Sequence, residues 1–266
     1  MIKLTQERVK DVLAYMEDDL PNCLYLYGDI VRYGINDPNM TVWFSEKDGK
    51  INAVVMKYFS GSHVYSKQLD YDLDEVVEKL REIDPDRISS QRLVIEALAP
   101  LLRDKYDVEY GTVFKEVCYR RMRSSVAIER ATPEDAGAIA ELLMTAEDFA
   151  KTYEQRTLAE ELANRMRNGI GRSYIIRDGE RIVAHSCVSL ETDQYMIESM
   201  TVVHDDYRPK MYGLLLDSYM INDITEEGKA LYGMVVEGPR LEGFIKMGHQ
   251  PVARYGKLFR RNLQEG

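Results

Sequence analysis

Two short hairpin signals stand at corresponding places in the two halves of the sequence, and they restrict the fold more than any other feature. Asp48-Gly49 separates two runs rich in β-branched and aromatic residues, and Asp178-Gly179 separates two more. Asp-Gly tolerates the positive φ angles of a tight turn between antiparallel strands. Each turn is followed by an Ile-x-Ala step, Ile51-Asn52-Ala53 and Ile182-Val183-Ala184. We therefore expect two copies of one α/β fold.

Periodicity around the turns predicts helices and strands in a similar order in both halves. For the first half it predicts helices at 5–18, capped by Thr5, 22–33, 73–83 and 91–103, and strands at 40–45, 51–59 and 63–65 (at an edge). Residues 106–119 are predicted to form a strand pair or one long strand. For the second half it predicts strands at 126–128, 173–176, 182–190, 195–203, 231–236 and 252–258, helices opening at Thr132 and Thr157, one helix over 210–223 and a short one after Pro239. The basic segment 120–125 lacks periodicity, which places an N-terminal domain at 1–122 and a C-terminal domain at 126–266.

The composition is that of a soluble globular protein. Of 266 residues, 45% are hydrophobic and 30% charged, so a sizeable core is available. The net charge of −10 argues against a nucleic-acid partner, which usually requires a basic surface. No apolar window is long enough for a membrane span, so no membrane is expected. Three widely spaced cysteines, Cys23, Cys118 and Cys187, fit the cytoplasm better than a disulfide framework.

The segment Tyr207–Gly213 has the pattern of an anion-binding loop. It follows the apolar run Met200–Val203 and precedes a helix-like run. The first turn of a helix leaves backbone N–H groups unpaired and carries the positive end of the helix dipole, which together bind phosphate. Arg208 and Lys210 add positive charge. The alternative is an ordinary strand-to-helix connection with surface basic residues.

At this point the second half resembles the GCN5-related N-acetyltransferase (GNAT) family, over residues 126–260. The loop residues Arg208, Lys210 and Gly213 fall on the family pattern Arg/Gln-x-x-Gly-x-Gly/Ala. Other residues that carry the resemblance are Thr132-Pro133-Glu134-Asp135, Asp178-Gly179, Gly238-Pro239 and Lys246-Met247-Gly248-His249. The first half resembles a diverged copy of the same fold without the loop.

The resemblance implies an α/β fold with two GNAT-like domains, each a mixed, mostly antiparallel central sheet flanked by helices. It implies transfer of an acetyl or other acyl group from acetyl-CoA or another acyl-CoA to a primary amine of a small molecule, bound between the halves, with no metal. Main-chain groups of Thr201, Val202 and Val203 would hold the pantetheine arm of CoA. The pyrophosphate would lie on the loop residues Arg208, Lys210, Met211, Tyr212 and Gly213.

Candidates for proton transfer follow from this reaction. Glu198, a carboxylate in an apolar strand, and His185 on the neighbouring strand are candidate bases. Glu198 has a second interpretation, as a residue on the open face of the sheet bonded to a neighbour. Since Phe244 occupies the position of the family's tyrosine acid, Tyr212 and Tyr255 are candidate acids. The remaining histidines, His63, His204 and His249, have no metal-ligand spacing, so no zinc site is expected.

Three departures from the family pattern support a second hypothesis. Pro209 lacks an N–H, Met211 stands where glycine is usual, and Phe244 replaces the tyrosine. A chain with these changes is also compatible with a catalytically inactive GNAT-fold protein that serves as a binding or dimerisation module. The sequence leaves a homodimer open.

Overall fold

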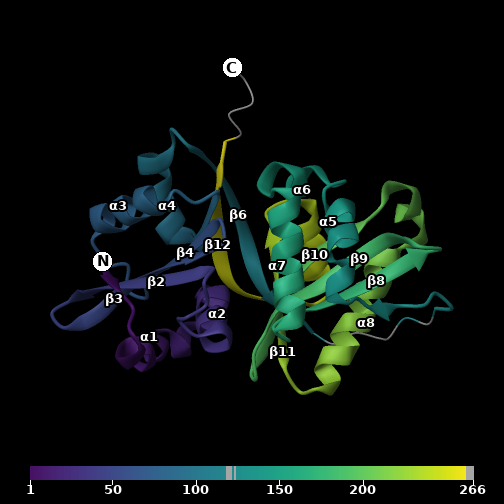
Figure 1. Cartoon of the computed structure of the whole chain (residues 1–266), viewed down its shortest axis with the longest axis horizontal. Coiled ribbons are helices and arrows are strands. Elements are labelled where there is room, and N and C mark those ends of the chain that lie inside the picture. The colour runs from purple at the N-terminus through teal and green to yellow at the C-terminus, as the bar shows by residue number, and fades with distance from the viewer. Residues whose placement is uncertain (118–121, 123, 262–266) are drawn as a thin grey trace. The chain divides into compact units, whose positions relative to one another are not determined.

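A computed structural model describes residues 1–117, 122 and 124–261, and the chain forms two compact units (Figure 1). Unit 1 contains Met1–Val113, Val235–Gly243 and the residues from Pro251 onward, and unit 2 contains Phe114–Met234 and Phe244–Gln250. No helix in the described ranges is long and apolar enough to cross a membrane.

Unit 1 is a sheet between two layers of helices. Its strands lie in the order β1-β2-β3-β4-β5-β12-β6. The bounds are β1 Ile2–Lys3, β2 Met40–Lys47, β3 Lys50–Tyr58, β4 Gly61–Tyr65, β5 Arg87–Gln91, β6 Tyr106–Lys115 and β12 Gln250–Arg260. The main helices are α1 Val9–Met16, α2 Leu24–Tyr33, α3 Leu73–Ile83 and α4 Arg92–Leu102. Helices α1 and α2 cover one face, and α3 and α4 cover the other (Figure 1).

The central strand β3 shows why this sheet needs both layers. Val54 and Val55 are both fully buried, yet they belong to different hydrophobic clusters, because successive side chains of a strand point to opposite faces. Val54 packs with Val12 and Leu26 from α1 and α2, whereas Val55 packs in the cluster of α3 and α4. A continuous apolar run is therefore required here rather than an alternating one.

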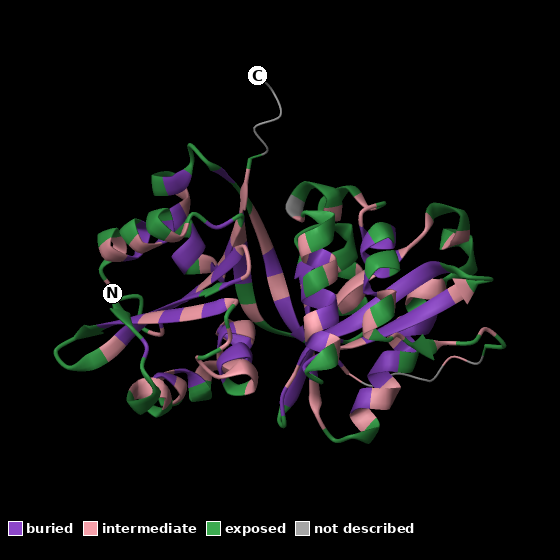
Figure 2. Ribbon diagram, in the orientation of Figure 1, coloured by how far each residue is buried: buried purple, intermediate pink, exposed green. Residues whose placement is uncertain are grey.

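Unit 2 repeats this arrangement. Its strands lie in the order β11-β10-β9-β8-β7. The bounds are β7 Glu129–Arg130, β8 Arg172–Asp178, β9 Arg181–Glu191, β10 Tyr195–Val203 and β11 Ala230–Val236. Its helices are α5 Ala136–Leu143, α6 Glu147–Thr152, α7 Gln155–Arg167 and α8 Tyr212–Glu226, followed by α9 Pro239–Lys246. Helices α5 and α7 pack on one face of the sheet and α8 packs on the other, and the strands between them are the most buried part of the unit (Figure 2).

The expected hairpins and the α/β fold class are confirmed. Asp48 and Gly49 have φ of 52° and 73°, and Gly179 has φ of 60°, as tight turns require. Each unit also contains a short parallel pair of strands. In unit 1, Gly61–His63 of β4 pairs with Arg87–Ser89, and in unit 2, Tyr195–Ile197 of β10 pairs with Ala230–Tyr232. The shared parallel pair strengthens the case for two copies of one fold.

Some expectations for single elements were wrong. The helices of residues 73–103 are separated by β5, which was not predicted because Arg87–Gln91 is mostly polar. As a result β4 lies inside the sheet, between β3 and β5, and is not an edge strand. The strand expected at 126–128 lies at Glu129–Arg130.

Two expected helix caps were also wrong. The side chain of Thr5 makes no cap hydrogen bond. Thr157 lies inside α7, whose N-cap is Glu154, and the Glu154 carboxylate accepts hydrogen bonds from the N–H groups of Arg156 (3.0 Å) and Thr157 (2.7 Å). At the other expected start, Asp135 accepts from the Thr132 N–H at 2.9 Å, so that helix opening is confirmed.

The compact units differ from the expected domains, 1–122 and 126–266. The last strand of the chain, β12, belongs to unit 1, where it pairs antiparallel with β5 and places Leu258 opposite Ile88. Residues 118–121 and 123 of the expected boundary segment, Cys118 included, lie outside the described residues. The two domain limits stay a prediction.

Replacing Gly111 by alanine should destabilise unit 1. A Cβ at Gly111 would lie 2.5 Å from the hydroxyl of Tyr255, whose side chain is buried on β12. Overpacking of this kind costs about 1–3 kcal/mol. Gly137→Ala is the matched control, because nothing lies within 4 Å of its Cβ position in α5. Thermal unfolding should show a lower Tm for Gly111→Ala alone, and equal Tm values would contradict the packing described.

Candidate functional site

Strand β10 contains a bulge near its C-terminal end. Ser199 lies opposite Cys187 of β9, but the next paired residues are Val202 and His185, so β10 has one residue more than β9 in this interval. Met200, at the bulge, has φ of 58°, which is in the left-handed region. A bulge turns backbone groups away from the regular ladder and often marks a functional site.

The other edge of β10 is open at the same level. Its pairing with β11 covers Tyr195–Ile197 and stops before the bulge. Among the described residues, the segment Glu198–Val203 therefore pairs with β9 on one side and with no strand on the other side. Thr201, Val202 and Val203, expected to bind pantetheine, all lie in this segment. The side chain of Thr201 is held by the Ser186 hydroxyl at 2.8 Å.

The loop after β10 differs from the expected one in detail. Residues Asp205–Lys210 form a short 3₁₀ helix that includes Pro209, and α8 begins at Tyr212 rather than at Lys210. The N-cap of α8 is Met211, with φ of 55° and an exposed side chain. Pro209 thus lies ahead of the helix, and its missing N–H removes no donor from the first turn of α8.

The N-terminus of α8 combines backbone donors with nearby positive charge. The amides of Tyr212, Gly213 and Leu214 form its first turn, which points unpaired N–H groups along the helix axis. Arg208 is exposed and forms an ion pair with Asp205 at 2.9 Å. The Lys210 ammonium lies 4.6 Å from the centre of the Tyr207 ring. Both basic side chains can therefore turn toward an anion at the helix end.

Two aromatic rings fix the shape of this loop. Tyr207 and Tyr212 stack with ring centres 6.1 Å apart, and the Tyr207 hydroxyl donates a hydrogen bond to Asp178. Asp178 ends β8 at the Asp-Gly turn, so the hairpin helps to hold the loop. A Cβ on Gly213 would make only an ordinary 3.5 Å contact with Val203, which agrees with glycine or alanine at this place in the pattern.

Glu198 lies at the start of the open segment and is only 8% exposed. Its Oε1 accepts a hydrogen bond from the Thr201 hydroxyl at 3.3 Å. Across from it on β11 is Gly233: a Cβ there would lie 3.8 Å from Glu198 Oε2 and 2.5 Å from Oε1 of Glu116. Gly233 therefore makes room for the buried carboxylate of Glu116 beside that of Glu198. Glu198 is thus bonded to a neighbour, as its second interpretation expects, and it is buried.

Glu116 and His249 were not predicted as site residues. Glu116 follows β6, and its N–H donates to the Leu231 carbonyl at 2.8 Å, which brings it beside β11. His249 Nδ1 lies 2.5 Å from Glu116 Oε2, and burial lowers the pKa of His249. His249 lies in a segment that carries the family resemblance, but nothing in that segment points to Glu116, because the sequence does not show that the two segments meet.

His185 and Cys187 are buried on β9. His185 Nδ1 lies 2.9 Å from the Met200 carbonyl oxygen and Nε2 lies 3.1 Å from the Ser173 hydroxyl. Burial lowers the pKa of His185 to about 4 and raises that of the Cys187 thiol to about 12. At neutral pH the imidazole is therefore uncharged, the thiol keeps its proton, and both ring nitrogens of His185 are already bonded.

The two candidate acids, Tyr212 and Tyr255, belong to different units. Tyr212 is the half-buried first residue of α8, beside the loop. Tyr255 belongs to unit 1, where burial raises its pKa and its hydroxyl has no hydrogen-bond partner among the described residues. Phe244 of α9 packs against Phe114 and His249, with ring centres 5.7 and 5.1 Å apart. Among the described residues, no three His, Cys, Asp or Glu side chains gather as metal ligands would.

Comparison with known proteins identifies the family of this site. Residues 117–238 match the family model described as an acetyltransferase (GNAT) domain. This segment is a GNAT domain. It includes the bulged strand, the loop and α8, and its family is one of acyltransferases. No protein with a curated function matches the sequence.

Solved structures extend the fold match beyond the GNAT domain. A tandem GNAT protein from the clavulanic acid biosynthesis pathway superposes with a TM-score of 0.62 at 15% identity, covering 97% of this chain and 96% of that one. A Drosophila protein gives 0.66 at 13% identity, with 97% of both chains covered. A GCN5-related N-acetyltransferase-like protein from Streptococcus suis gives 0.62 at 10% identity, covering 96% and 99%. At these identities the match shows the fold, and that fold is a tandem GNAT fold.

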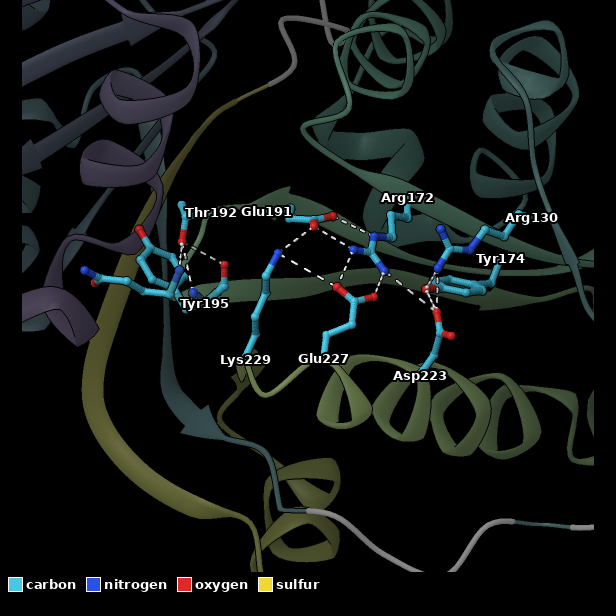
Figure 3. A network of polar contacts seen from close by, with 10 residues as sticks. Arg130, Arg172, Tyr174, Glu191, Thr192, Tyr195, Asp223, Glu227 and Lys229 are labelled. Carbon is cyan, nitrogen blue, oxygen red and sulfur yellow. Dashed lines mark hydrogen bonds and ion pairs between the residues drawn. The ribbon is translucent and has the colours of Figure 1, made fainter.

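An ion-pair network fastens the far end of α8 to the sheet of the GNAT domain (Figure 3). Arg172 of β8 binds Glu191 at 2.6 Å and Glu227, just after α8, at 2.8 Å. Lys229 binds Glu191 at 2.8 Å. Nearby, Asp223 of α8 accepts hydrogen bonds from Arg130 at 2.6 Å and the Tyr174 hydroxyl at 2.8 Å. The helix that presents the anion site is thus fixed at its opposite end.

The carboxylates of this network have lowered pKa values. The hydrogen bond from Arg172 lowers the pKa of Glu227. Burial by itself would raise the pKa of Glu191, but hydrogen bonds from Arg172 and Lys229 more than reverse that effect. A carboxyl whose pKa is lower in the folded state stabilises the fold above its ordinary pKa, about 4. This stabilisation is lost as the pH falls through the folded-state value.

Arg172→Met should destabilise the protein at pH 7 by about 2 kcal/mol, between the values for exposed and buried ion pairs. The decline of stability from pH 5 to pH 3 should also become less steep, since the lowered carboxyl pKa values depend on Arg172. Urea unfolding across this pH range measures both effects. Arg156→Met is the control, because Arg156 forms an exposed ion pair with Glu160 on α7. Equal losses in the two variants would contradict the role given to the network.

Proposed function

We propose that the protein transfers an acyl group from acyl-CoA, acetyl-CoA in the first instance, to a primary amine of a small molecule. The observation that carries this proposal is the combination of the open, bulged end of β10 with the helix N-terminus of α8 directly after it. The pantetheine arm would bond to main-chain groups of Thr201–Val203. The pyrophosphate would lie on the amides of Tyr212 and Gly213, with Arg208 and Lys210 beside it.

In this reaction the amine nitrogen attacks the thioester carbonyl, the C–N bond forms and the C–S bond breaks. The nitrogen loses a proton and the CoA thiolate gains one. Glu198 is the proposed base, because it lies at the start of the open segment beside the bulge that would hold pantetheine. Tyr212, at the start of α8, is the proposed acid. Two neighbouring carboxylates, Glu198 and Glu116, favour a cationic amine as acceptor.

The alternative, an inactive binding or dimerisation module, is favoured by Met211 and Phe244. Met211 keeps the left-handed conformation of a glycine but adds a side chain at the helix end. Phe244 has no hydroxyl to donate. The two proposals differ in a direct test: turnover of acetyl-CoA with a panel of small amines supports the enzyme, whereas CoA binding without turnover supports the module.

Arg208→Ala should weaken CoA binding about tenfold, the effect of losing one charge-assisted contact of about 1.4 kcal/mol. Isothermal titration with CoA at low salt measures this change. Arg156→Ala, which removes the same charge from an exposed place on α7, should leave the affinity unchanged. An absence of heat with the unaltered protein at millimolar CoA would overturn the proposed function.

Glu198→Gln should lower kcat by roughly 10²–10⁴, the usual contribution of a general base, with CoA affinity unchanged. Steady-state kinetics and CoA titration of the same preparation separate these effects. Full activity of Glu198→Gln would show that another group takes the proton.

Met211→Gly should tighten CoA binding. Glycine takes the left-handed conformation without the cost that a Cβ imposes, and it removes a side chain from the helix end. Titration with CoA should give a lower Kd for this variant. Weaker binding would mean that the Met211 side chain itself contacts the ligand.

A further inference from the structure

The imidazole of His185 makes two hydrogen bonds inside the sheet of unit 2, and together they fix its protonation. The Met200 carbonyl, 2.9 Å from Nδ1, only accepts, so Nδ1 carries the hydrogen. Nε2 must then accept from the Ser173 hydroxyl, 3.1 Å away. His185 is fully buried and Ser173 is 3% exposed, so water does not compete for these bonds.

The Met200 carbonyl needs such a donor because it lies at the bulge. The pairing of β10 with β9 passes from Ser199 to Val202 and skips Met200. Met200 is half-buried, and a carbonyl that is left out of the ladder needs another partner. The left-handed conformation of Met200 is itself unfavourable for a residue with a Cβ. The hydrogen bond from His185 offsets both costs from the β9 side of the strand.

We infer that His185 is a positioning residue, which holds the bulge of β10 in the shape that receives the pantetheine arm of acyl-CoA. This role rests on the proposed function. Because the ring bonds to Met200 from the β9 side, the opposite edge of Glu198–Val203 stays open to a ligand. His185 itself does not touch the substrate, since both of its nitrogens are already bonded.

Two substitutions at one position test the inference. His185→Leu removes both hydrogen bonds with little change in volume, whereas His185→Asn keeps an N–H donor near the place of Nδ1. CoA titration should give an affinity about tenfold weaker for His185→Leu and within about threefold of the unaltered protein for His185→Asn, since about 1.4 kcal/mol is tenfold. Leu190→Ala, a buried change on the same strand beyond the bulge, should lower the Tm without changing the CoA affinity.

Failure of the inference can be told from failure of the proposed function. If the unaltered protein does not bind CoA, the proposed function and this role are both overturned. If the unaltered protein binds CoA and His185→Leu binds equally well, only the role of His185 is overturned. A loss of affinity in Leu190→Ala equal to that in His185→Leu would also overturn it, because the effect would then be one of general stability.

A double-mutant cycle tests the step through Met200. Glycine adopts the left-handed conformation freely, so in a Met200→Gly background His185→Leu should weaken CoA binding only about threefold. A tenfold loss in both backgrounds would show that His185 does not act through Met200. In the unaltered protein, ¹⁵N NMR of the imidazole should show hydrogen on Nδ1 and no titration between pH 8 and pH 5. Hydrogen on Nε2 would overturn the inference.

Discussion

The candidate site depends on how the backbone of β10 is satisfied around its bulge. A strand inside a buried sheet must pair its N–H and C=O groups, and a bulge breaks that pairing at one place. Here the Met200 carbonyl finds a partner on the β9 side, because the His185 imidazole donates to it. On the same side the Ser186 hydroxyl holds the side-chain hydroxyl of Thr201. The β11 side is left open. β10 therefore stays paired with β9 up to Val203, where the loop before α8 begins.

The carboxylates beside this opening come from segments far apart in the sequence. Glu198 is on β10 itself, while Glu116 follows the last strand of the first half and His249 follows α9. What permits the arrangement is the missing side chain of Gly233, since any Cβ there would collide with Glu116. One glycine in β11 thus allows a buried carboxylate to lie beside Glu198.

Much of the fold was predictable because the sequence repeats local signals that need no distant partner. The Asp-Gly turns, the helix over Leu73–Ile83 and the strand over Tyr195–Val203 follow from turn chemistry and periodicity, and the structure has them at those places. β5 was missed because its polar residues owe their strand conformation to β4 and β12 on either side. The pairing of Glu116 with His249 could not be predicted either, because the two residues are far apart in the sequence and meet only in the folded chain. The bulge at Met200 could not be predicted from the sequence, since methionine rarely adopts the left-handed conformation.

The pairing of β12 with β5 has a consequence for how the chain is made. Unit 1 contains the first 113 residues, but the strand beside β5 is contributed by residues 250–260. During synthesis the sheet of unit 1 stays incomplete until residues 250–260 have been made. Until then the edge of β5 is exposed. Contacts this distant in sequence form slowly. A fragment that ends after the first half would lack β12, a strand inside the sheet of unit 1. The first copy of the fold is therefore complete only when it is part of the same chain as the second copy.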